Sequence, residues 1–154
     1  TVLERLARPD SGLSEPGLSQ SYYTYEALMT RKDKYGTEAL RRIETIWGTM
    51  LDAGATTFWE TITGASDFNN AGSLCHGWSA VPVYVLYHDV LGVRPLEPGF
   101  RKFTVDPLSQ AVHACSGRVP VPGGEIAVSW EQPDGDNTNC NVTAPAELTY
   151  VEKR

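Results

Sequence analysis

Long apolar runs are missing from this sequence, since the longest, Ala80 to Leu86, is interrupted by Pro82. A helix that crosses a membrane needs about 18 consecutive apolar residues, so we expect no membrane partner. Positive charge is also scarce: 13 lysines and arginines stand against 19 aspartates and glutamates, for a net charge of −6. Nucleic-acid binders present a basic face to the phosphates. The balance therefore argues against a nucleic-acid partner and suits a neutral ligand such as a sugar.

Cysteine is equally sparse, with only Cys75, Cys115 and Cys140, and no CxxC pair among them. An odd count excludes complete pairing within the chain, so we expect buried free thiols. The cysteines and the three histidines show no metal-ligand spacing, and neither a phosphate-binding loop nor a dinucleotide fingerprint occurs. The sequence therefore predicts no metal site and no organic cofactor.

The pattern of apolar residues changes near residue 95. Before it, helical spacing predicts helices over about 19–32, 39–51 and 79–91, with a turn at Tyr35-Gly36 and the first sixteen residues as a loop. The first two helices should form an antiparallel hairpin. Three helices cannot enclose a core of any size. We therefore expect residues 1–95 to be the end of a larger helical layer, and the chain to be a piece of a longer protein.

After Pro98-Gly99 the apolar residues alternate, which predicts short strands at 103–105, 112–119, 125–130, 139–144 and 148–151. Clusters rich in glycine, proline, aspartate and asparagine separate them. Short strands with such turn signals are typical of an antiparallel β-sandwich. The predicted class is thus α+β, with a helical domain over 1–95 and a sandwich domain over 96–154.

Glu60 ends the stretch that starts at Gly54, just beyond the second predicted helix, so it should lie in a loop. It follows Phe58 and Trp59 directly. A carboxylate beside aromatic surface loses hydration, which suits it to proton transfer. Spacing alone leaves two interpretations open: a general acid or base, and a surface glutamate beside a core tryptophan.

His76 precedes Gly77 and Trp78 just before the third predicted helix. An imidazole at that place could bond a sugar hydroxyl, and the indole offers a stacking plane. The other interpretation is a packed structural pair of histidine and tryptophan. Ser79 is predicted to cap the helix rather than to act as a nucleophile, because no Gly-x-Ser-x-Gly elbow surrounds it.

Hydrolysis of a glycosidic bond normally requires two carboxyl groups. The remaining acids offer weak partners for Glu60, because they fall in late helical turns or in the strand region. Asp67, in a loop, is the only second candidate that we would test.

A series of short segments carries a family resemblance between about residues 20 and 130. They are YYTYEAL (22–28), WGTML (47–51), GATTFWE (54–60), CHGWSAVP (75–82), LGVRP (91–95), PGF (98–100) and VPVPGG (119–124). In this order they resemble the α-L-rhamnosidases of bacterial type, which belong to the six-hairpin glycosidase group. The chain resembles the C-terminal part of such an enzyme.

The resemblance implies the last helices of an (α/α)6 barrel followed by a β-sandwich, and hydrolysis of terminal α-L-rhamnose with inversion. It implies that Glu60 is the general base and that His76 contacts the rhamnose, with Trp59 and Trp78 shaping the pocket. A rhamnose-containing glycoside is then the substrate, and no metal or cofactor is needed.

The family's general acid lies upstream, outside these 154 residues, so the chain alone is expected to be inactive. Two alternatives remain: a non-catalytic carbohydrate-binding or structural sandwich, and a six-hairpin glycosidase with another sugar specificity. Uncovered apolar helix faces also predict either self-association or a partner that carries the missing barrel portion.

Overall fold

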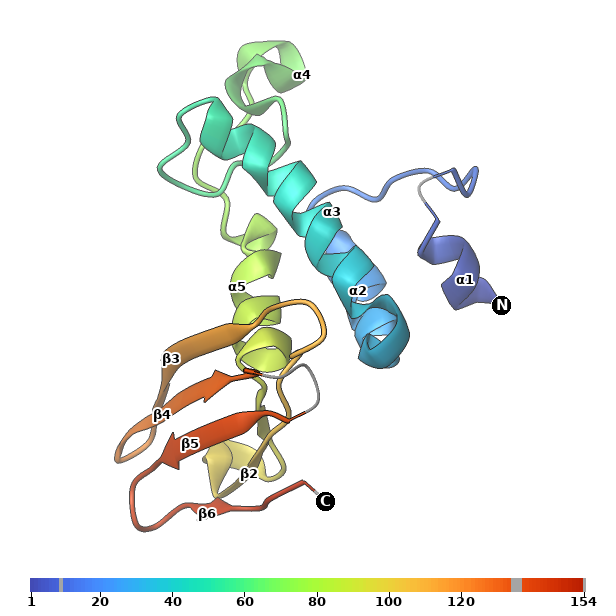
Figure 1. Ribbon diagram of the computed structural model, residues 1–154. Coiled ribbons are helices and arrows are strands. Elements are labelled where there is room, and N and C mark those ends of the chain that lie inside the picture. The colour runs from blue at the N-terminus through green and yellow to red at the C-terminus, as the bar shows by residue number, and fades with distance from the viewer. Residues whose placement is uncertain (9, 134–136, 154) are drawn as a thin grey trace. The chain divides into compact units, whose positions relative to one another are not determined.

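The computed structural model describes residues 1–8, 10–133 and 137–153. The chain forms two compact units, Thr1–Val83 and Tyr84–Arg154. The first unit is helical, and the second holds the strands (Figure 1). No helix in the described ranges is long and apolar enough to span a bilayer. The domain boundary expected at residue 95 stays a prediction.

The first unit begins with a short helix, α1 (Val2–Leu6), within the stretch predicted to be a loop. The prediction was wrong there because a capping box starts the chain. The Thr1 hydroxyl oxygen accepts the Glu4 backbone N–H at 3.2 Å, and the Glu4 side chain bonds back to the Thr1 amine at 2.6 Å. Thr-x-x-Glu is the sequence signature of this arrangement.

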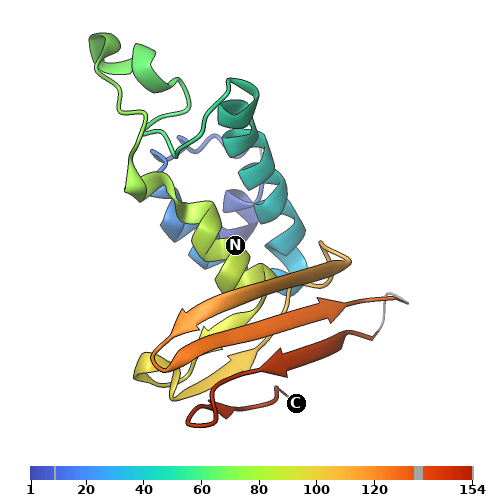
Figure 2. The ribbon, with the colours of Figure 1, turned by 90° about the vertical axis from the view of Figure 1, so that its left-hand side faces the viewer.

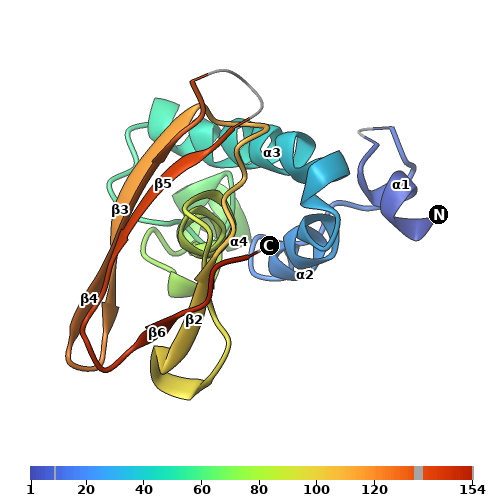
Figure 3. The same ribbon diagram turned by 60° about the horizontal axis from the view of Figure 1, so that its bottom comes forward.

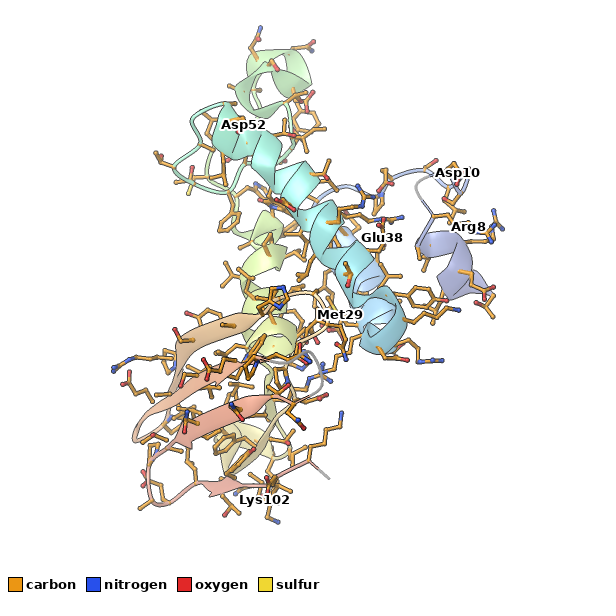
Figure 4. All side chains as sticks on the ribbon, in the orientation of Figure 1. Arg8, Asp10, Met29, Glu38, Asp52 and Lys102 are labelled. Carbon is orange, nitrogen blue, oxygen red and sulfur yellow. The ribbon has the colours of Figure 1, made fainter. Side chains whose placement is uncertain are left out.

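Two longer helices follow, α2 (Ser21–Met29) and α3 (Lys32–Asp52), whose ends at Met29 and Asp52 are labelled in Figure 4. Tyr25 of α2 packs on Trp47 of α3, with ring centroids 6.1 Å apart. The turn predicted at Tyr35-Gly36 is wrong, because both residues are buried inside α3. The buried stripe of α3 starts at Tyr35 and continues through Ala39, Ile43, Trp47 and Met50. Its helical spacing outweighs the weak breaking effect of one glycine.

The third predicted helix is present but irregular. A 3-10 turn η2 (Gly77–Ser79) leads into α5 (Val81–Val85), which continues as a π-helical turn η3 (Leu86–Val90). Gly92 ends it, as predicted, with φ +87°. Its carbonyl accepts the Asp106 N–H at 2.8 Å, and a Cβ on Gly92 would lie 2.5 Å from the Asp106 carbonyl carbon. Only glycine accepts this φ and this close approach without strain.

The second unit contains two three-stranded sheets (Figure 3). One has the order β1-β2-β6 and the other β3-β4-β5, the latter antiparallel throughout. The bounds are β1 (Val93–Pro95), β2 (Lys102–Val105), β3 (Ala114–Val121), β4 (Gly124–Glu131), β5 (Asn139–Thr143) and β6 (Thr149–Tyr150). All five predicted strands are therefore present, and the class is α+β. Strand β1 was not predicted, and the purely antiparallel prediction was wrong for β2 and β6, which pair in parallel.

Alternation along β4 builds the core of the second unit. Ile126, Val128 and Trp130 are buried, whereas Ser129 and Glu131 on the opposite face are exposed (Figure 2 shows the ladder that β4 forms with its neighbours). This period of two is the signature of a strand with one buried face. The sequence pattern from 125 to 130 predicted it for that reason.

A buried ion pair lies in the second unit where the helical segment meets the strands. The Asp89 side chain is 1% exposed, and Arg94 Nη2 donates to its Oδ1 at 2.5 Å. Arg94 Nη1 also lies 3.9 Å from Asp106 Oδ2. A buried carboxylate requires such a partner, because an uncompensated charge in this environment is strongly destabilising.

The three cysteines are free, but the prediction that they are buried was wrong for Cys75 and Cys140, which are exposed. Cys75 lies in a loop, and Cys140 lies on β5, which pairs only with β4 in its sheet. Cys115 is half-buried. Desolvation raises the pKa of the Cys115 and Cys140 thiols, which disfavours their reactive thiolate forms.

Candidate active site

The predicted site residues lie in the connection from the end of α3 to η2, all within the first unit. We call 57–60 the first arm and 73–76 the second arm of this loop. The Glu60 N–H donates to the Ser73 carbonyl at 2.9 Å, and the His76 N–H donates to the Phe58 carbonyl at 2.7 Å. The Thr57 hydroxyl bonds the Leu74 carbonyl. The two arms therefore run side by side and bring Glu60 and His76 to one part of the loop.

Residues 61–72 form a compact segment that connects the two arms. It contains a 3-10 turn η1 (Gly64–Ser66) and the turn α4 (Asp67–Asn70). Phe68, Asn69 and Asn70 have φ of 52°, 58° and 66°. This turn is therefore left-handed, a conformation that costs roughly 1–2 kcal/mol per residue for L-amino acids. Sequence periodicity cannot predict such a turn, and strained backbone of this kind tends to collect at functional loops.

Two glycines let the segment 61–72 pack tightly against Trp59. A Cβ on Gly64 would lie 2.6 Å from Cε3 of the Trp59 ring, and a Cβ on Gly72 would lie 2.0 Å from the Gly64 carbonyl oxygen. Trp59 is half-buried as a result. The Trp59 ring therefore lies directly against Gly64. Its role in shaping a sugar pocket stays a prediction.

Glu60 is half-buried and makes two hydrogen bonds with the backbone of Ser73. Its Oε2 accepts the Ser73 N–H at 3.2 Å, while its own N–H donates to the Ser73 carbonyl. This reciprocal pair fixes the carboxylate at the start of the second arm. A carboxylate held in a defined place on a loop is what a positioned proton acceptor requires.

His76 and Trp78 form the packed pair that the sequence allowed. Their ring centroids lie 5.4 Å apart with the planes at 89°, an edge-to-face contact. Trp78 is nevertheless 73% exposed, and His76 is only half-buried. Both interpretations are therefore compatible: the pair is structural, and it presents an imidazole and an indole surface to solvent.

Asp67 lies at the start of α4, where Thr63 Oγ1 donates to its Oδ2 at 2.5 Å. Hydrogen bonds from the Thr61 and Thr63 hydroxyls lower the pKa of Asp67. A general acid must hold its proton near neutral pH. Asp67 is therefore poorly suited to be the acid that complements Glu60.

Ser79 is not the helix N-cap that the sequence predicts. Its side chain is buried, and its hydroxyl lies 2.5 Å from the Trp59 carbonyl oxygen and 2.8 Å from the His76 carbonyl oxygen. An N-cap accepts a bond from an amide N–H, whereas Ser79 donates to carbonyls. No local pattern predicts this contact, because one acceptor is 20 residues away in the chain.

An apolar hollow of about 390 Å³ lies beside the first arm. It is formed by one side of α3, by residues 55–58 and by Pro82. Leu51 on its rim is 70% exposed. Neither Glu60 nor His76 lines it, so the hollow and the candidate site are separate features of the first unit.

Comparison with known proteins identifies the family. Residues 92–151 match the family model described as the bacterial alpha-L-rhamnosidase C-terminal domain. A crystal structure of a family GH78 rhamnosidase from Bacillus sp. GL1 superposes with a TM-score of 0.83 and 31% identity, over 97% of this chain and 16% of that one. Fold and family together define the class: the chain belongs with the glycoside hydrolases of family GH78.

Within that class, the chain corresponds to the C-terminal part of a bacterial α-L-rhamnosidase. An alpha-L-rhamnosidase of Alteromonas sp. (strain LOR) is 34% identical over 109 residues, which are 67% of this chain and 12% of that protein. One from Formosa agariphila is 32% identical over 92 residues, or 55% and 10%. The chain thus spans only a small part of the relatives that it matches.

Proposed function

We propose that this chain supplies the general base of an inverting α-L-rhamnosidase, and that Glu60 is this base. One observation carries the proposal: the two arms hold the Glu60 carboxylate on the same short loop as His76 and Trp78. The similarity to α-L-rhamnosidases supports rhamnose as the sugar. The loop geometry supports Glu60 as the base.

An inverting glycosidase places a water between two carboxyl groups roughly 6.5–9.5 Å apart. The base takes a proton from that water as it attacks the anomeric carbon, and the acid protonates the departing oxygen. Glu60 fits the first role. Hydrogen bonds from two threonine hydroxyls lower the pKa of Asp67, which argues against it as the acid. In line with the family resemblance, we propose that the acid comes from protein outside these 154 residues. We therefore propose that the chain is inactive by itself.

The neighbouring aromatic side chains would bind the sugar. An imidazole nitrogen of His76 can bond a rhamnose hydroxyl, and the exposed Trp78 indole offers an apolar plane beside it. Trp59, wedged under Gly64, would keep the first arm in shape. No metal or cofactor is required, because a carboxylate pair performs this chemistry unaided.

The proposal extends to the architecture. We propose that α2, α3 and α5 are the last helices of an (α/α)6 barrel, within a helical domain over 1–95, and that 96–154 form the appended β-domain. The apolar hollow on α3 supports this, because such a surface is usually covered by further protein. The missing barrel portion or a second copy of the chain would cover it.

A panel of aryl glycosides tests the proposed specificity. The protein that contains this chain should hydrolyse an aryl α-L-rhamnoside with inversion, so that proton NMR detects β-L-rhamnose before mutarotation. Aryl α-L-fucosides and α-D-glucosides should be much poorer substrates, because the ring hydroxyls of both sugars are placed differently for His76. Faster turnover of a fucoside or glucoside would reassign the sugar. Binding of rhamnose without any turnover would instead indicate a carbohydrate-binding module.

A further inference from the structure

We propose that Ser79 is a positioning residue of this site, which holds Glu60 and His76 in register through its buried hydroxyl. The inference rests on the proposed function and names a residue that neither touches substrate nor belongs to the predicted set. The Ser79 side chain is 1% exposed. Its oxygen lies within hydrogen-bond distance of the carbonyl of the residue before Glu60 and of His76 itself.

A hydroxyl has one proton to donate, so the two carbonyls share it or exchange it. Either way, the Ser79 oxygen bridges the Trp59 carbonyl of the first arm and the His76 carbonyl of the second. The Trp59 contact fixes the peptide that leads into Glu60. The His76 contact, at 2.8 Å, fixes the peptide that follows the histidine. A shift of either peptide would move the side chain that it carries.

Ser79 is itself anchored to the helical scaffold. The buried indole Nε1 of Trp47 on α3 donates to the Ser79 carbonyl at 2.8 Å. The chain of bonds thus runs from α3 through Trp47 to Ser79, and from Ser79 to both arms. The arms also bond each other through the Glu60 and His76 amides. Removal of the hydroxyl leaves the arms paired and leaves the Ser79 N–H bonded to the His76 carbonyl at 3.1 Å, but it removes the bond that ties the first arm to Ser79 and so to α3.

Ser21 provides a matched control in the same unit. It is also buried, and its hydroxyl donates to the Leu18 carbonyl at 2.5 Å, at the start of α2. Ser79→Ala and Ser21→Ala each remove one buried bond from a hydroxyl to a backbone carbonyl. A general loss of stability should therefore be similar in both variants. Only the Ser79 change acts on the candidate site.

The test compares both variants in the protein that contains this chain, with an aryl α-L-rhamnoside as the probe. A smaller folded fraction lowers the apparent kcat and leaves KM unchanged, whereas a displaced His76 raises KM. We expect Ser79→Ala to lower kcat at least tenfold and to raise KM severalfold, with Ser21→Ala within twofold of the parent. In a Glu60→Gln background, Ser79→Ala should lower kcat by less than threefold, because the base is already lost. Equal effects of the two alanine variants would overturn the proposal, as would a full tenfold loss in the Glu60→Gln background.

Hydrogen exchange supplies a readout that does not depend on activity. The Glu60 and His76 amides should exchange faster in Ser79→Ala and at the parental rate in Ser21→Ala; unchanged rates in Ser79→Ala would overturn the positioning role. If Ser79→Ala does not fold, Ser79→Cys keeps the shape with a weaker donor and should show a smaller shift in the same direction. A parent without rhamnosidase activity would defeat the proposed function but not the exchange result. If the parent is active but Ser79→Ala leaves kcat, KM and amide exchange unchanged, only this inference is overturned.

Discussion

Two candidate site residues, Glu60 and His76, lie on arms that hydrogen-bond each other, and Ser79 bonds the backbone of both arms. Glu60 and His76 could be singled out because their signals are local: aromatic neighbours, a loop after a helix, and an adjacent glycine. The structure places both on paired arms, and their roles remain predictions. Ser79 could not be assigned, because its partners come from distant backbone carbonyls. Gly92 lies between these cases: its place at the end of the helix was predictable, but its contact with Asp106 was not.

Gly92→Ala tests that contact. The left-handed φ alone costs roughly 1–2 kcal/mol for a residue with a Cβ, and the new atom would press on the backbone of Asp106 and Pro107. We expect the free energy of unfolding to fall by more than about 2 kcal/mol, measured by urea denaturation. Gly48→Ala is the control, because its Cβ would meet nothing within 4 Å and alanine favours a helix by about 0.5–1 kcal/mol. Equal midpoints for the two variants would contradict this account.

Elements were predicted well where a period or a turn cluster defines them. The strands from β2 to β6 follow alternation and glycine- or proline-rich turns, and α3 follows its apolar stripe. The failures have separate physical causes. Strand β1 has only three residues, one of them Pro95, and the parallel pairing of β6 depends on tertiary contacts. The turn α4 is left-handed, which no apolar period encodes.

The hollow on α3 leads to a prediction about association. Apolar surface of this kind drives contacts between molecules when no other protein covers it. We expect the isolated 154-residue chain to sediment as a dimer or larger species at high concentration, and Leu51→Glu to weaken that association. Tyr23→Glu is the matched control, since Tyr23 is 73% exposed on α2 and does not line the hollow. A strict monomer at high concentration would be evidence against the proposal.

At the scale of the whole molecule, the change of pattern near residue 95 falls close to the first strand, β1, which begins at Val93. The domain boundary at residue 95 stays a prediction. The comparisons confirm the family that the sequence resembles. The match to the GH78 structure covers 97% of this chain but only 16% of that one. The proposed mechanism reflects this difference in length. In the proposed mechanism this chain supplies one carboxylate, Glu60, whereas the reaction requires two.

Glu60→Gln, in the protein that contains this chain, tests the central claim most directly. A general base contributes roughly 10²–10⁴-fold to the rate, so kcat on an aryl α-L-rhamnoside should fall by about that factor, with KM little changed. Glu152→Gln, a change at an exposed glutamate of the second unit, should leave kcat near that of the parent, and the 154-residue chain alone should release no rhamnose. Near-normal turnover by Glu60→Gln would contradict the account and remove Glu60 from the mechanism.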